Sequence, residues 1–429
     1  MKKALATLLI LFLASPCWAL LEEKKVSLKE AIDTALEINP QIKMMKIDVQ
    51  KSKNDIKIQN QLQNPSIGTG QNIGKTAKGN AEQISADYVI EILKRGKRKK
   101  AAQSESLALA NNQKFQELSF VAEIKFAYIN LLLKKANLKI TTEQMQISKE
   151  IYDSTTKQEE DKKASKTDAI QAKIAYNRAY LYKNIAKSEM VTAQNEFNAI
   201  MNSNNFDYNT QADYLNNDYE SLLTLSPNDD FLTFEKVKDF ALKNRYDIKK
   251  AAQDVETAQN NLAVVRSKLI PDVAISGGYQ YETKGMSDNG VFLNGAFAGL
   301  QIVNIPLFYR YKPEIENAKL DIEKAQLNYE DVKIDATRSI TDAWEKYTIA
   351  KNNLAFYNNE LLYNSKELLM ESIKNLAAKE IDLTSFLVSK KLYLELSLGY
   401  VEALSEYYIN YAQLLKEMNL VELNKEEFI

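Results

Sequence analysis

The chain has 429 residues and a formal net charge of −1, with 56 basic and 57 acidic residues, so it lacks the basic excess of nucleic-acid-binding proteins. It contains no histidine and one cysteine, Cys17. These absences exclude imidazole metal ligands, histidine-activated nucleophiles and intrachain disulfides. We therefore expect a protein that is not an enzyme, with no cofactor and no metal site. A metal site made of carboxylates alone is the alternative, but the spacing of the acidic residues does not support one.

The first residues have the pattern of a secretory signal. Lys2 and Lys3 precede an apolar stretch at residues 4–14, and Ser15-Pro16-Cys17-Trp18-Ala19 then offers a cleavage site after Ala19. We predict that residues 1–19 are a signal peptide. Cys17 could alternatively carry a lipid, but Pro16 before it fits a lipoprotein signal poorly. No later apolar run reaches 18 residues, so a membrane crossing would have to use strands.

Two glycine-rich islands interrupt a chain that otherwise favours helices. Residues 66–92 and 272–305 alternate apolar with small or polar side chains, which predicts one β-hairpin in each. Such alternation is typical of a membrane barrel strand, with lipid on one side and water on the other. A soluble hairpin packed on helices is the alternative. The residues predicted to face lipid are Ile67, Ile73, Tyr88, Ile90, Val273, Ile275, Tyr279, Tyr281, Leu293 and Phe297.

The two islands belong to two copies of one plan. Residues 27–36 resemble residues 233–242 at an offset of 206, and the offset continues to Pro65 and Pro271. Each copy is predicted to hold a helix, a hairpin, a very long helix and a returning helix. Ser27 and Glu30 form a capping-box pattern at the first helix. We place the repeats at residues 20–201 and 231–420, with a linker at 202–230 and a tail at 421–429.

Heptad series mark the long helices as coiled-coil elements. Apolar residues recur every seven positions, which predicts packing on more than one neighbouring helix. The helix at residues 317–378 would be about 90 Å long at about 1.5 Å per residue. The series are Ile322, Tyr329, Ala336, Ala343, Ala350 and Tyr357; Ile340, Tyr347, Leu354, Leu361 and Leu368; and Leu387, Leu394, Val401, Tyr408 and Leu415.

Four strands cannot close a barrel, and an open strand edge in lipid leaves backbone groups without hydrogen bonds. If the hairpins lie in a membrane, several protomers must therefore share one barrel.

Several short motifs, in order, resemble the TolC-like outer-membrane efflux family. The resemblance covers the chain after the signal peptide. The motif Gly96-Lys97-Arg98 is similar to that of the branch of the family that serves metal-cation efflux. The motifs are Ser27-Leu28-Lys29-Glu30-Ala31 with Asn39-Pro40, Asn64-Pro65, Gly96-Lys97-Arg98, Ile270-Pro271 and Ile305-Pro306-Leu307-Phe308.

The resemblance implies a mainly α protein with membrane β structure. It implies a long coiled-coil α-helical barrel beneath a trimeric 12-stranded β-barrel, with four strands per protomer. The implied partners are two further protomers, a periplasmic adaptor, an inner-membrane transporter of the resistance-nodulation-division type and outer-membrane lipid, without nucleic acid. The implied place is the outer membrane of a Gram-negative bacterium, with a long periplasmic extension.

The implied function is an exit duct for small toxic molecules or metal cations. Type I protein secretion is an alternative within the same family. A soluble periplasmic coiled-coil scaffold or adaptor is the alternative from another class, and it would bury the hairpin residues in protein.

The resemblance also places a gate at the two helix–turn–helix tips. The family has glycine where this chain has Lys162 and Lys379, so we expect a turn of different shape. Acidic ring positions of some members fall here on Ser385 and Val388, which are not acidic. The nearby charges could instead be ordinary solvated groups. The tip candidates are Lys162, Ser165, Asp168, Lys379, Glu380, Asp382, Ser385 and Val388.

Overall fold

The computed structural model describes residues 24–72, 81–203, 208–210, 232–282, 295–378 and 380–422. The predicted signal peptide with Cys17 lies outside the described residues, as do Ile73, Leu293 and Lys379. So do most of the predicted linker and most of the predicted C-terminal tail.

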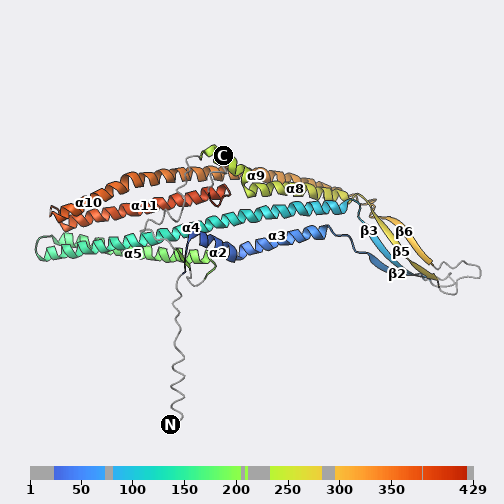
Figure 1. The fold of residues 1–429 in the computed structure, drawn as a ribbon, viewed down its shortest axis with the longest axis horizontal. Coiled ribbons are helices and arrows are strands. Elements are labelled where there is room, and N and C mark those ends of the chain that lie inside the picture. The colour runs from blue at the N-terminus through green and yellow to red at the C-terminus, as the bar shows by residue number, and fades with distance from the viewer. Residues whose placement is uncertain are drawn as a thin grey trace, which may run out of the picture. The chain divides into compact units, whose positions relative to one another are not determined.

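The described residues are mostly helical, and two strand pairs interrupt the helices (Figure 1). The same order of helices, strand pair and long helices occurs twice along the chain. In order, the elements are β1 (Lys24–Val26), α2 (Leu28–Ile38), α3 (Pro40–Gln59), β2 (Ser66–Asn72), β3 (Ala81–Ile90), α4 (Lys94–Glu160), α5 (Lys166–Ile200), β4 (Tyr208–Thr210), α7 (Phe234–Asn244), α8 (Tyr246–Ser267), β5 (Asp272–Glu282), β6 (Gly295–Val303), α9 (Lys312–Phe356), the π-helix η2 (Tyr357–Leu362), α10 (Tyr363–Ala377) and α11 (Leu383–Glu417).

The chain divides into two compact units. Unit 1 comprises residues 1–43, 117–238 and 340–429, and unit 2 comprises residues 44–116 and 239–339. Each predicted repeat contributes to both units, because α4 and α9 begin in unit 2 and end in unit 1.

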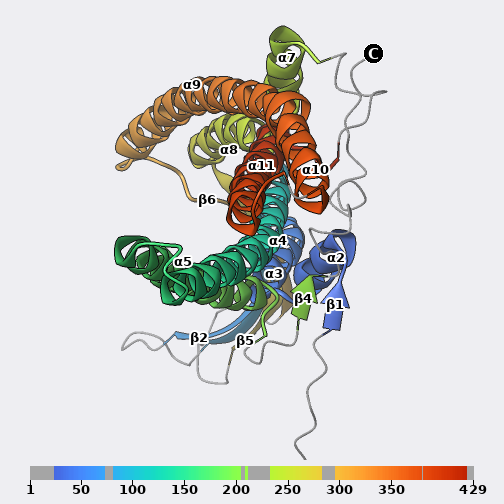
Figure 2. The same cartoon turned by 90° about the vertical axis from the view of Figure 1, so that its left-hand side faces the viewer.

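The core of unit 1 forms where α4 and α11 meet. Leu387, Leu394 and Val401 on α11 are buried against Ala136, Ile140 and Ile147 of α4. Tyr408 and Leu415 continue the same seven-residue series and are also buried, as the heptad pattern predicts. Figure 2 looks along these helices and shows α10 beside α11.

A short parallel strand pair, which the sequence did not predict, closes the other side of unit 1. β1 pairs with β4, and Val26 lies opposite Thr210. The hydroxyl of Tyr128 on α4 donates to the carbonyl oxygen of Val26 at 3.0 Å. The Phe197 ring meets the Tyr128 ring edge-on, with centroids 5.7 Å apart. Two helices and the strand pair therefore share one aromatic contact.

The π-helix η2 shifts the heptad phase of the long helix. Ala336, Ala343 and Ala350 are buried as predicted, but Leu368 is 44% exposed and that prediction is wrong. Ser365 and Ser372 are buried instead. Ser365 follows Ala350 by two heptads plus one residue, and Ser372 follows Ser365 by one heptad. A π-turn inserts one extra residue into an α-helix, so η2 accounts for the added residue. Opposite η2, a Cβ at Gly399 would lie 2.9 Å from the Tyr357 ring, so the ring sits directly on the backbone of α11.

The helices of unit 2 meet through small and polar side chains. Ser52 on α3 and Ser106 on α4 lie 2.9 Å apart through their hydroxyl oxygens, and both are buried. The Asn260 amide on α8 donates to the Ser104 hydroxyl at 3.1 Å. Such short side chains allow close helix packing, and their paired polar groups avoid the cost of unsatisfied burial.

The sheet of unit 2 has four antiparallel strands in the order β2-β3-β5-β6. Its strands lie within the two predicted hairpin ranges. The central pair joins the two hairpins, with Tyr88 opposite Ile275 and Ile84 opposite Tyr279. Among the described residues, the outer edges of β2 and β6 have no strand partner.

Candidate functional site

The first candidate surface is the turn between α4 and α5. The Lys163 amide donates to the Gln158 carbonyl at 2.7 Å, and the Lys162 amide donates to the Glu159 carbonyl at 2.9 Å. These two bonds form a Schellman motif, whose central residue takes a left-handed conformation. Lys162 has a φ of 61°. Lys162 thus adopts the conformation that glycine favours, so the lysine does not prevent a turn of the glycine type.

The helix after this turn begins with a capping box. The Asp168 amide donates to the Ser165 hydroxyl at 3.1 Å, and the Ser165 amide donates to the Asp168 carboxylate at 3.1 Å. The bonds from Ser165 lower the pKa of Asp168 below its ordinary value. The predicted tip residues Ser165 and Asp168 are thus brought together, and they define where α5 starts.

The second tip is built in a related way. The Glu380 amide donates to the Asn375 carbonyl at 2.9 Å, again spanning five residues. Asp382 caps α11, because its carboxylate accepts the Ser385 amide at 2.8 Å. This bonding to Ser385 lowers the pKa of Asp382. Both tips lie at one end of unit 1, at the left in Figure 1.

The tip side chains are exposed. Val388, one turn into α11, is 56% exposed, and Glu380 and Ser385 are exposed as well. Asp168 and Asp382 do more than carry solvated charge, since each caps a helix. No group of three or more acidic or thiol side chains within the described residues is placed to hold a metal ion.

The second candidate surface is the exposed face of the four-stranded sheet. The register puts Tyr88, Ile275 and Leu300 in one row across three strands. It puts Ile90, Val273 and Ile302 in the next row towards the helices. Most large apolar residues on this face are exposed. They are Ile67, Ile84, Ile90, Ile275, Tyr279, Tyr281, Leu300 and Ile302.

Phe297 does not belong to this face. The register pairs it with Gly278, whereas Ile275 pairs with Leu300 and Tyr279 with Ala296. A Cβ at Gly278 would lie 2.8 Å from the Phe297 ring and would also meet the Ile84 carbonyl oxygen. The prediction that Phe297 shares a face with Ile275 and Tyr279 is therefore wrong. Leu300 and Ile302 occupy the exposed face of β6 instead.

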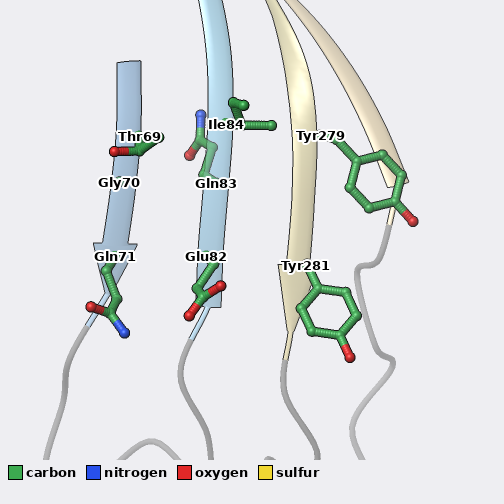
Figure 3. A pocket seen from close by; sticks show the side chains of 8 residues that line it. All are labelled: Thr69, Gly70, Gln71, Glu82, Gln83, Ile84, Tyr279 and Tyr281. Carbon is green, nitrogen blue, oxygen red and sulfur yellow. The ribbon is translucent and has the colours of Figure 1, made fainter. Parts of the chain in front are cut away.

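The exposed face turns polar at its loop end. Gln71, Glu82 and Tyr281 stand in one row beyond Thr69, Ile84 and Tyr279 (Figure 3). A shallow concavity of about 420 Å³ lies here. Its lining residues are Thr69, Gly70, Gln71, Glu82, Gln83, Ile84, Tyr279 and Tyr281.

A buried ion-pair network joins the other end of the sheet to the helices. The Lys94 ammonium at the start of α4 lies 2.6 Å from the Asp272 carboxylate, and their side chains are only 13% and 4% exposed. The Asn304 amide, after β6, donates to the same carboxylate at 2.9 Å. Arg98 pairs with Glu91 at 2.6 Å. Sequence reasoning missed this network, although charges next to the predicted strand ends could have indicated it.

None of the described helices combines the length and apolar composition that a membrane-crossing helix needs.

Comparison with known proteins identifies the family. The profile of the outer membrane efflux proteins matches residues 31–203 and 238–372, which is more than half of the chain. A search of curated sequences finds no match.

Solved structures share the fold at low sequence identity. A Pseudomonas aeruginosa membrane protein aligns with a TM-score of 0.68 at 14% identity, over 91% of this chain and 93% of that one. The Campylobacter jejuni outer membrane channel CmeC aligns with a TM-score of 0.67 at 17% identity, over 94% and 89%. The Vibrio cholerae outer membrane protein VceC aligns with a TM-score of 0.68 at 15% identity, over 92% and 97%. With the profile match covering both halves, the chain belongs to the TolC-like outer membrane efflux protein family.

Proposed function

We propose that three copies of this chain form the outer-membrane exit duct of a tripartite efflux system. In this proposal each protomer supplies four strands to a shared 12-stranded barrel. The long helices form a periplasmic tunnel below it.

The exposed apolar face of the sheet carries this proposal. Ile67, Leu300 and Ile302 are 78%, 77% and 62% exposed on one face of a sheet whose outer edges lack strand partners among the described residues. In water such a face would drive aggregation. In a bilayer, lipid covers the face, and strands of neighbouring protomers satisfy both edges.

The helical hairpins support a gated passage rather than catalysis. Their tips are short turns closed by Ser165 and Asp382 caps, with exposed side chains on either side. We propose that an adaptor protein binds these tips, with Lys162, Lys379, Glu380 and Val388 as contact candidates. The family consists of channel proteins, which supports a role without covalent chemistry.

The energy for transport would come from a partner. The sequence contains no phosphate-binding loop, so the proposed duct is passive and an inner-membrane transporter drives export. Small toxic molecules or metal cations are the proposed cargo, and the transporter is proposed to be of the resistance-nodulation-division type.

Membrane fractionation followed by a native gel of detergent extracts tests the duct. A trimer that needs detergent and that conducts ions in a planar bilayer is the expected result. A water-soluble periplasmic monomer or dimer would refute the proposal and favour the scaffold alternative.

Cargo needs a separate test. A deletion strain should become sensitive to toxic small molecules or metal cations, and the plasmid-borne gene should restore resistance. Full resistance combined with loss of one secreted protein would instead favour type I secretion.

A further inference from the structure

The start of α4 carries an unusual concentration of positive charge. Six of its first seven residues, 94–100, are lysine or arginine, and the first turn has no acidic residue. The N-terminus of a helix already has a partial positive charge, so cations there are unfavourable for the isolated helix. Anions outside the helix are therefore needed to neutralise these cations.

Within the described residues, two of these six charges have an ion-pair partner. Lys94 pairs with Asp272 and Arg98 pairs with Glu91. Arg95, Lys97, Lys99 and Lys100 form no ion pair within the described ranges. Arg95 and Lys100 are exposed, and Lys97 and Lys99 are half-buried. Four cations therefore remain available to an external anion.

An exposed aromatic and basic segment lies at the same end of the sheet. Asp272 holds both Lys94 and Asn304, so the start of α4 and the chain leaving β6 meet there. Phe308, four residues beyond Asn304, is fully exposed. Leu307 and Tyr309 are exposed beside it, and Arg310 follows. Aromatic side chains of this kind favour the boundary between lipid tails and headgroups.

These cations also continue the exposed apolar face of the sheet. Ile90, the last residue of β3, is 40% exposed and lies four residues before Lys94. Apolar rows, exposed aromatics and cations thus follow one another along the chain. That is the order of lipid tails, interface and headgroups met on leaving a bilayer.

We propose that a basic collar, formed by Arg95, Lys97, Lys99 and Lys100, binds the phosphodiester headgroups of anionic glycerophospholipids. The leaflet concerned is the one next to the helices. This inference rests on the proposed function, because it requires the sheet to lie in a bilayer. The collar would set the depth of the protein in the membrane.

Native mass spectrometry of the detergent-solubilised protein tests the collar. Phosphatidylglycerol and phosphatidylcholine serve as competing probes. The test variant is R95Q/K97Q/K99Q/K100Q. The control K139Q/K149Q/K157Q/K173Q removes the same charge from exposed lysines of α4 and α5 in unit 1, which form no ion pair with any residue that the structure describes. We expect the wild type and the control to prefer phosphatidylglycerol, and the test variant to bind it about tenfold more weakly or worse.

A second measurement needs no variant. Because the collar acts through charge, about 1 M salt, at which the Debye length is about 3 Å, should abolish the preference of the wild type for phosphatidylglycerol.

Equal phosphatidylglycerol binding by test and control variants would overturn the proposal. So would a test variant that keeps its lipid preference but changes the ion selectivity of the channel, since the cations would then face the lumen. Failure of the duct itself would be seen separately, as a wild type that fractionates as a soluble protein.

Discussion

Replacing Lys162 with glycine should stabilise the tip between α4 and α5. The left-handed conformation costs a residue with a Cβ about 1–2 kcal/mol, and glycine avoids this cost. Glycine loses more conformational entropy on folding, which offsets roughly half of the gain. Lys162 has a φ of 61°, is exposed and makes no ion pair in the described part of the chain. The net gain should be about 1 kcal/mol, or about a fivefold smaller open population of the turn.

Hydrogen exchange measured by mass spectrometry on the whole protein reports this population. The useful peptide covers residues 158–166, because the Lys163 and Ala164 amides both donate to the Gln158 carbonyl. We expect exchange in K162G to slow about fivefold. The matched control is K163G, since Lys163 does not have a positive φ and should gain nothing from glycine. Unchanged or faster exchange in K162G, or equal slowing in K163G, would refute the conformational argument.

Three further predictions concern the sheet, the cap and a buried lysine. Leu300→Arg should lower the stability of the folded protein in the membrane by about 2–4 kcal/mol if this face meets lipid, and it should reduce the yield of SDS-resistant trimer. Phe297→Arg, on the other face of the sheet, should leave more trimer and alter the conductance of the channel. Equal trimer yields of the two variants would contradict the assignment of the two faces. The lowered pKa of Asp168 means that its capping contribution is present above its ordinary pKa and is lost as the pH falls through the lowered value. Acid should therefore speed proteolysis at the tip, and Ser165→Ala should weaken this pH dependence, because alanine keeps only the backbone amide donor. Burial lowers the pKa of Lys125 to about 8, so the native state binds fewer protons than the unfolded state between about pH 8 and 10.5. The free energy of unfolding in detergent should therefore rise across that interval, and a Lys125→Met variant that rises equally would show that other groups are responsible.

Much of the architecture follows from periodicity in the sequence. The series from Leu387 to Leu415 is buried because a seven-residue repeat keeps one helix face towards its partner. The two hairpins follow from period-two alternation, which is strong in β5, where Ile275 and Tyr279 are exposed between smaller residues. These signals are local and repeated, so they survive without knowledge of tertiary contacts.

The face of β6 could not be assigned in this way. Phe297, Leu300 and Ile302 are all large and apolar, yet they fall on both parities of the strand. Only the register with β5 decides between them, and a shift of one residue exchanges the two faces. The strand pair β1–β4 was missed for another reason, since three residues in each strand are too few to show alternation.

The capping roles of the candidate tip residues were not predicted from the sequence. The sequence placed Ser165, Asp168 and Asp382 near the turns, but the hydrogen bonds that make them caps depend on where each helix starts. The left-handed φ of Lys162 does not follow from the residue itself, because lysine disfavours that conformation, and only the glycine of related chains at this position indicated it.

The π-helix η2 has a consequence for how this family can vary in length. One extra residue turns every later side chain by about 100° around the helix axis. The helix before η2, α9, and the helix after it, α10, therefore present different sides to α11. The Tyr357 ring seated on Gly399 marks the point where the two phases meet. In a regular stretch of coiled coil, adding or removing one residue would turn the apolar side chains away from the partner helix. At η2 the helix already contains one extra residue, so the packing on either side does not depend on an unbroken heptad count. We therefore expect η2 to be the place where related chains gain or lose a single residue without changing either half of the long helix.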